Sequence, residues 1–162
     1  MRMEEYIEED QLPHRRSIRL SHHNYQWSAS YFVTIRSNHH EPIFEMPELH
    51  AIVEETWKRL PERFTWISLD SYIVMPDHFH GILHFLITDM PALSLGRVIG
   101  AYKSITTVEW LRYVKAHNVY WSGVLWQRNY YEYIIRDNLE LEQKRLYIQN
   151  NPIRWATNNP YQ

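Results

Sequence analysis

Two histidines separated by one residue, His78 and His80, are the first candidates for chemistry in this sequence. They follow Pro76-Asp77, where two strands are predicted to meet, and the second strand begins with His78. Because side chains alternate between faces along a strand, both imidazoles lie on one face, with Cα atoms ~6.6 Å apart. That spacing lets both rings bind one metal ion, and we expect them to face the surface rather than the core. With ten histidines in the chain, such a triplet can also arise by composition alone.

A second candidate group lies near the end of the chain, where the pattern predicts a last helix over 139–150, capped by Asp137-Asn138. Tyr147 and Asn151 are four residues apart and share a helix face, and Lys144 is on the same face. Alone, these residues are more typical of an ordinary amphipathic helix end. Asn151 precedes Pro152, which disfavours helical geometry, so we expect the helix to end there.

The elements that must position these two groups are predicted in the order β-α-β-β-α-β-α. Two helices alternating with hairpin-joined strands predict an α+β fold: an antiparallel sheet of the ferredoxin-like or RRM-like kind, with helices packed on it. The last helix, which carries Tyr147, is an addition to that fold. Strands are predicted over residues 31–36, 64–75, 78–87 and 124–131, and helices over 46–60, 94–114 and 139–150.

The composition is that of one ordinary globular domain, with 162 residues of which 44% are hydrophobic and 22% charged. The absence of cysteine excludes a disulfide framework and a thiolate metal site. No apolar run approaches the length of a membrane span, and the start of the chain lacks an apolar signal-peptide core. We therefore expect a cytoplasmic protein that makes no membrane contact.

Charge is distributed unevenly along the chain. The first ten residues hold one arginine and five acids, which leaves 16 basic and 14 acidic residues beyond them. We expect residues 1–12 to form a disordered acidic tail and residues 13–162 to form a single domain with a basic N-terminal arm. The arginines of this arm, Arg15, Arg16 and Arg19, could hold DNA phosphates or form an ordinary solvated tail. With a net charge of −2 overall, any nucleic-acid site must be a local patch.

Six short segments follow one another in order from about residue 13 to 157, without large gaps. Together they resemble the recurring motifs of the HUH single-tyrosine transposases, and most nearly the branch of REP-associated tyrosine transposases. Several motifs at consistent spacing are more specific than any one of them. The segments are Arg15–Leu20, Tyr31–Ile35, Val74–His80, Ser94–Gly96, Trp126–Tyr131 and Tyr147–Pro152.

The resemblance implies a role for each candidate residue. His78 and His80 would be metal ligands, Asn151 the third ligand and Tyr147 the nucleophile. The implied cofactor is a divalent metal, Mg²⁺ or Mn²⁺, and the residues leave open which of the two is bound. A free tyrosine has a pKa of about 10, so the nucleophile needs activation. Lys144, one turn away, is our candidate for that task.

The resemblance also implies a reaction. Attack by tyrosine leaves a 5′-phosphotyrosine and a free 3′-hydroxyl, which conserves the bond for later rejoining. We therefore predict a metal-dependent, transposase-like endonuclease and strand transferase that acts on single-stranded DNA near hairpins. Besides the arm, Lys103 and Arg128 are assigned to DNA binding. Tyr131 is a rival nucleophile, ranked second because it has no ligand four residues later. Many relatives carry histidine at the position of Tyr133, which leaves its polar role open.

A non-catalytic module is the alternative function. Aromatic residues make up 15% of the chain, and on an RRM-like sheet they could stack with the bases of single-stranded nucleic acid. The sequence leaves open whether the protein is a monomer or a homodimer, which DNA sequence it recognises, and whether it still transposes or now serves its host.

Overall fold

The computed structural model describes residues 27–86, 94–121 and 123–158. Its central layer is an antiparallel sheet of four strands in the order β2-β3-β1-β4. This order and the α+β class confirm the predicted ferredoxin-like fold. The strands are β1 (Trp27–Arg36), β2 (Ile67–Val74), β3 (His78–Leu86) and β4 (Tyr131–Ile135), and the helices are α1 (Pro47–Lys58), α2 (Leu60–Arg63), α3 (Leu95–Ala116) and α4 (Asn138–Asn158).

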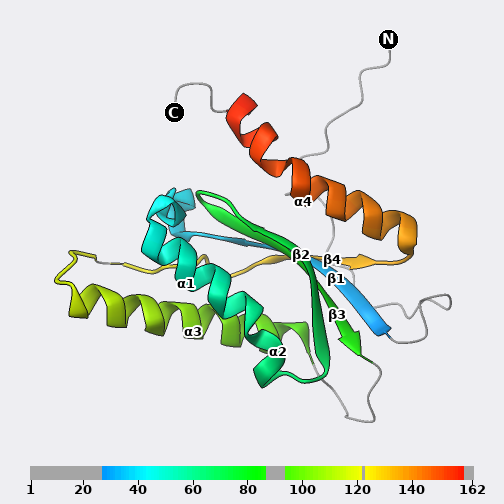
Figure 1. The fold of residues 1–162 in the computed structure, drawn as a ribbon, viewed down its shortest axis with the longest axis horizontal. Coiled ribbons are helices and arrows are strands. Elements are labelled where there is room, and N and C mark those ends of the chain that lie inside the picture. The colour runs from blue at the N-terminus through cyan, green and yellow to red at the C-terminus, as the bar shows by residue number, and fades with distance from the viewer. Residues whose placement is uncertain (1–26, 87–93, 122, 159–162) are drawn as a thin grey trace.

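Helices cover both faces of the sheet. The helices α1, α2 and α3 lie on one side and α4 crosses the other (Figure 1). Each face has its own apolar cluster, and the one under α4 is the smaller. Its buried members are Phe32, Ile82, Ile135, Leu141 and Ile148. None of the helices in the described ranges combines the length and apolar character that a membrane span needs.

Strand β3 contributes side chains to both clusters, because successive side chains along a strand point to opposite faces of the sheet. Phe79 and Leu83 are fully buried in the cluster under α1 and α3, as predicted for Phe79. Gly81 lies between them, and a Cβ atom there would lie only 2.5 Å from the Trp57 ring. A larger residue would push α1 away from the sheet. On the other face, His80 lies under α4, close to its Tyr147 ring.

The fourth strand lies later in the chain than predicted. Residues 124–131 were expected to form it, but apart from Tyr131 they contribute only an isolated bridge between Trp126 and Ser37. The reason is that Leu125 and Trp126 are drawn into the α3-side core, where the Trp126 indole donates to Thr106 Oγ1 (2.8 Å).

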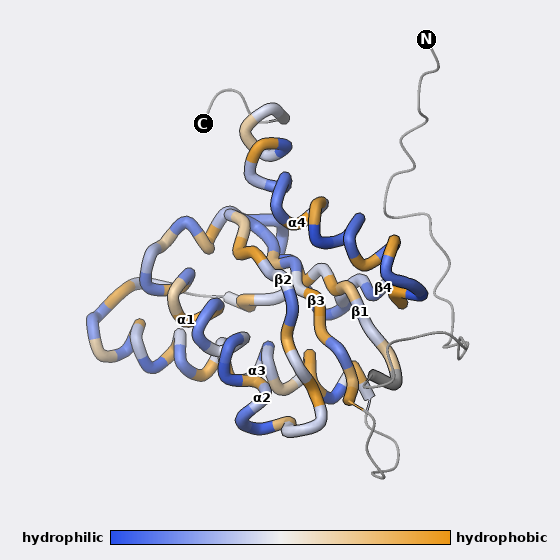
Figure 2. Tube along the Cα trace, turned by 45° about the vertical axis from the view of Figure 1, so that its right-hand side comes forward, coloured by the Kyte–Doolittle hydropathy of each residue, from blue (hydrophilic) through white to orange (hydrophobic). Residues whose placement is uncertain are grey.

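The prediction that the last helix ends at Asn150 is wrong. Helix α4 continues through Pro152 to Asn158. Proline cannot donate to the carbonyl oxygen of Ile148, but that costs one bond in a helix of 21 residues. Trp155, beyond the proline, lies 6.0 Å from the His78 ring, a contact that favours continuation. The axis of α4 turns in its C-terminal part, as Figures 1 and 2 show, and a bend is the usual effect of an internal proline.

Candidate functional site

The two strand histidines lie side by side at the start of β3, on the face that α4 covers. Their ring centroids are 4.6 Å apart. The cross-strand partners on β1 are Arg36 opposite His78 and Thr34 opposite His80. The prediction that the two imidazoles share one face is therefore confirmed.

His80 is buried, which corrects the expectation that it faces the surface: only 2% of the residue is exposed. Its Nδ1 lies 2.8 Å from Thr34 Oγ1, while its Nε2 is buried without a hydrogen-bond partner. Burial, and then the positive charges around it, hold the pKa of His80 well below its ordinary value. The ring is thus neutral at neutral pH. When Nδ1 donates to Thr34, Nε2 presents a bare lone pair.

His78 is oriented by its chain neighbour. Its Nδ1 lies 2.5 Å from Asp77 Oδ1. A carboxylate that accepts from one ring nitrogen fixes the tautomer in which the other nitrogen can bind a metal. His78 and His80 are therefore both held by Nδ1, by a carboxylate in one case and a hydroxyl in the other.

Tyr147 reaches this pair from α4. Its ring stands edge-on to His80 with centroids 5.2 Å apart, and it also packs on Phe32 at 5.7 Å. Lys144 Nζ lies 5.8 Å from the Tyr147 centroid and closer to the rings of Phe32 (4.6 Å) and Tyr133 (4.5 Å). The ammonium group is thus held among three aromatic faces, beside the phenol that it was predicted to activate.

Asn151 is placed by its neighbours on the helix. It follows Tyr147 by four residues and precedes Trp155 by four, so the three share one face of α4. Tyr147 contacts His80 and Trp155 contacts His78. Asn151 therefore lies between two residues that each touch one histidine, and it is 6% exposed.

Sequence reasoning missed Arg154 and Trp155 because it ended the helix too early. The Arg154 guanidinium lies 5.1 Å from the Tyr147 ring centroid. Arg154 follows Tyr147 by seven residues, two turns along the same face, which is the signal that could have found it. Tyr147 therefore has a cation near its ring on each side, Lys144 and Arg154.

The residues predicted to bind DNA differ in what the structure says of them. Arg15, Arg16 and Arg19 fall outside the described residues. Arg128 is exposed. Lys103 is half-buried, which lowers its pKa to about 8. Its ammonium group donates to the carbonyl oxygens of Gln127 (2.8 Å), Arg128 (3.2 Å) and Asn129 (3.0 Å). These bonds to the loop remove the support for assigning Lys103 to DNA.

Two further tyrosines lie on the same face of the sheet. Tyr131 pairs with Thr34, the residue that pairs on its other side with His80. Tyr131 is thus two strands away from the histidines, whereas Tyr147 touches one of them. Tyr133 donates to Glu140 Oε1 (3.0 Å).

The donor set fits a divalent cation. Within the described ranges, no group of three or more His, Cys, Asp or Glu side chains is placed to hold a metal. The predicted set differs because its third member is the amide of Asn151. Two imidazoles and an amide oxygen suit Mn²⁺ or Mg²⁺. The orphaned Nε2 of His80 is the observation that speaks for such a ligand.

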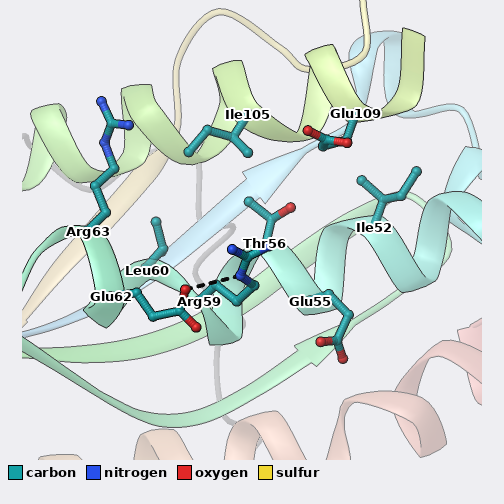
Figure 3. A pocket seen from close by; sticks show the side chains of 9 residues that line it. All are labelled: Ile52, Glu55, Thr56, Arg59, Leu60, Glu62, Arg63, Ile105 and Glu109. Atoms are coloured by element: carbon teal, nitrogen blue, oxygen red, sulfur yellow. Dashed lines mark hydrogen bonds and ion pairs between the residues drawn. The ribbon is translucent and has the colours of Figure 1, made fainter. Parts of the chain in front are cut away.

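A cavity of about 570 Å³ lies on the other side of the sheet, between α1, α2 and α3 (Figure 3). Its lining is a mixture of aliphatic and charged groups and includes neither histidine nor tyrosine. One of its arginines, Arg59, is already bonded to Glu62 (3.2 Å), the dashed line in Figure 3. The candidate reactive residues therefore lie under α4, and none of them lines this cavity.

Comparison with known proteins finds similarity to a transposase family. A family model described as "Transposase IS200 like" matches residues 25–151. An uncharacterized protein of Haemophilus influenzae Rd is 33% identical over 174 residues, which cover 91% of this chain and 93% of that protein.

Two solved structures share the fold. One is described as a REP-associated tyrosine transposase bound to a REP hairpin, with a TM-score of 0.64 and 14% identity over 90% of this chain and 75% of that chain. The other is a candidate transposase of Deinococcus radiodurans R1, with a TM-score of 0.51 and 18% identity over 75% of this chain and 88% of that chain.

Proposed function

The chain belongs to the IS200-like transposase family, whose work is the processing of DNA, and from this premise we propose that it nicks and rejoins single-stranded DNA beside hairpins. The cut would pass through a covalent bond between Tyr147 and the 5′-phosphate. The observation that carries this proposal is the contact of Tyr147 with His80, whose Nε2 has no partner in the protein.

In the proposed reaction the Tyr147 oxygen forms a bond to phosphorus while the bond from phosphorus to the 3′-oxygen breaks. The proton that the phenol loses balances the one that the 3′-oxygen gains. The products are a 5′-phosphotyrosine and a 3′-hydroxyl, and attack by another 3′-hydroxyl reverses the step without ATP. His78, His80 and Asn151 would hold a divalent cation, Mg²⁺ or Mn²⁺, which supplies charge stabilisation at the phosphate when it is bound.

The remaining groups around the phenol fit this chemistry. Lys144 and Arg154 place positive charge near Tyr147 on two sides, which favours its ionised form. The same charges would attract a phosphate. We assign Lys144 to activation of Tyr147 and Arg154 to contact with the phosphate group.

Hairpin DNA is the proposed partner. One structural neighbour is described as bound to a REP hairpin, and a nucleophile between α4 and the sheet suits a single strand better than a duplex. Arg15, Arg16, Arg19 and Arg128 are the proposed backbone contacts. The alternative of an RRM-like stacking platform loses support, because α4 packs on the sheet face that such a module would need open.

The test is a search for a covalent adduct. A labelled pool of single-stranded oligonucleotides, with one fixed hairpin and randomised flanks, is incubated with protein and Mn²⁺ and then run on a denaturing gel. We expect a label that migrates with the protein, is lost with EDTA and is absent for Tyr147→Phe. Retention of the pool on native gels without any adduct would instead support the non-catalytic module.

A further inference from the structure

A second polar group is buried under α4, near the other end of β3. His84 is 1% exposed, its Nδ1 lies 2.7 Å from Ser30 Oγ, and its Nε2 donates to Asp70 Oδ2 (3.0 Å). Both ring nitrogens are therefore engaged. Although serine, histidine and aspartate meet here, burial leaves no room for a substrate, so this is not a nucleophilic site.

Asp70 also holds an arginine from α4. Arg145 Nε donates to Oδ1 (2.9 Å) and Nη2 donates to Oδ2 (2.6 Å), a two-pronged pair of fixed geometry. Burial alone would raise the pKa of Asp70, but the bonds from His84, Arg145 and the Ser71 amide hold that pKa far below its ordinary value. The carboxylate is thus charged and saturated with donors. It joins β2, β3 and α4 at one point.

A bulge in β2 begins at Asp70. The pairing of β2 with β3 shifts register between Leu69 and Tyr72, so that Asp70 and Ser71 together oppose one residue of β3. Asp70 keeps the alternation of Ser68 and Leu69, so it lies on the α4 face with His84, and the extra residue returns Tyr72 to the opposite face. The Ser71 amide donates to Asp70 Oδ1 (2.6 Å), which fixes the carboxylate further.

The anchor and the nucleophile lie on opposite flanks of α4. Arg145 and Tyr147 are two residues apart, or roughly 200° around the helix axis. Between them the buried Ile148 faces the sheet. Apolar contacts such as this one leave a helix free to roll slightly, whereas a two-pronged ion pair on one flank does not. Any roll of α4 would move the Tyr147 ring relative to His80.

From these contacts we propose that the Asp70–Arg145 ion pair, supported by His84, is a positioning device that fixes the rotation of α4 and so holds Tyr147 against His80. In this role Arg145 and Asp70 need no contact with DNA or with the reacting atoms. They act through the helix, and the inference rests on the proposed function. An error of about 1 Å in the position of a nucleophile can cost a hundredfold in rate.

The first arm of the test measures single-turnover adduct formation at saturating hairpin DNA and Mn²⁺. We expect Arg145→Met to lower the rate constant by about 10- to 100-fold, with full amplitude and with DNA affinity within about threefold of wild type. Arg145→Lys, which keeps the charge, recovers part of the rate. A purely stabilising ion pair would lower the melting temperature and the amplitude instead. Arg59→Met is the matched control. It breaks the exposed Arg59–Glu62 ion pair, which lies on the opposite side of the sheet from α4, and should leave the rate unchanged.

The second arm needs neither DNA nor metal. In protein labelled with 3-fluorotyrosine, the ¹⁹F resonance of Tyr147 is identified by its loss in Tyr147→Phe. Arg145→Met should move it toward the position of the free amino acid, because the ring leaves Phe32 and His80, while Arg59→Met leaves it in place.

The outcomes separate this inference from the proposed function. A rate constant for Arg145→Met within twofold of wild type overturns the positioning role. If wild-type protein forms no adduct at all, the proposed function fails, and the fluorine resonance then decides alone. A Tyr147 resonance unmoved in Arg145→Met would overturn the inference in that case.

Discussion

His80 and His84 occupy equivalent places and yet end in opposite states. Both lie on β3 under α4, and each is held at Nδ1 by the hydroxyl of the β1 residue opposite it, Thr34 for His80 and Ser30 for His84. They differ at Nε2, which meets Asp70 in His84 and no protein group in His80. We call the two regions the open end and the closed end of the histidine row.

The difference teaches what separates the proposed metal ligand, His80, from a structural histidine on the same strand. A buried imidazole nitrogen without a partner is costly, so a fold retains one where another ligand completes it. At the closed end, Asp70 and Arg145 supply that completion from within the chain. The open end leaves it to something outside the protein, and Tyr147, the proposed nucleophile, lies beside it.

The largest expected effect is that of the proposed nucleophile, Tyr147, at the open end. Tyr147→Phe removes one hydroxyl and little volume, so we expect adduct formation to fall by more than about a thousandfold while binding of hairpin DNA persists. Tyr131→Phe and Tyr130→Phe are the controls and should stay within about tenfold of wild type. Mass spectrometry of the trapped complex locates the modified peptide. A 5′-phosphate on Tyr131 would show that the attack comes from the sheet and not from α4.

The next effect compares the two histidines directly. His80→Gln should reduce Mn²⁺-dependent cleavage by more than about a hundredfold, because it removes a ligand that the protein leaves open. His84→Gln should lower cleavage by about tenfold at most, because it disturbs only the anchor of α4. Nicking rates are measured at equal folded fractions, as judged by circular dichroism. Equal losses for the two variants would mean that the free Nε2 of His80 has no special role.

For stability we expect the opposite ranking, with the larger loss from a substitution at the closed end. Asp70→Asn leaves Arg145 and His84 without their charged partner, so the free energy of unfolding should fall by about 2–4 kcal/mol. Thr34→Val, at the open end, should cost about 1 kcal/mol, the usual net value of one hydrogen bond. Urea denaturation without metal measures both. A larger loss for Thr34→Val than for Asp70→Asn would contradict the assignment of the structural anchor to the closed end.

The smallest expected effect is on the pH dependence of stability. The two ends should lose their contributions to stability in different pH ranges. The pKa of His80 is lowered in the folded state, so the unfolded chain binds the proton first as pH falls below about 6.5, and the stability from the neutral ring is lost there. The pKa of Asp70 is lowered too, but its contribution is lost only below about 3.8.

Melting temperatures of the metal-free protein between pH 8 and pH 3 test these windows. We expect His80→Gln to flatten the curve between about pH 6.5 and 5, and Asp70→Asn to flatten it only at the acidic end. If the curve of His80→Gln ran parallel to that of wild type, the buried neutral state of His80 would be contradicted.

Local spacing was enough to predict much of this protein. Alternation along a strand placed His78 and His80 on one face, and helical periodicity placed Tyr147 and Asn151 on one face of α4. The order of strands and helices led to the ferredoxin-like sheet. These features depend on neighbours within a few residues, which is why a single sequence reveals them.

Only the tertiary structure decided which polar groups are left open and which are closed. Asp70 reaches His84 and Arg145 across 14 and 75 residues of sequence, and no local pattern predicts these contacts. Lys103 likewise resembles a surface cation in the sequence, yet its ammonium group donates hydrogen bonds to three carbonyl oxygens of a distant loop. The continuation of α4 through Pro152 depends on contacts beyond the proline. A hydrogen bond is satisfied in space rather than in sequence, so the difference between His80 and His84 exists only in the folded chain.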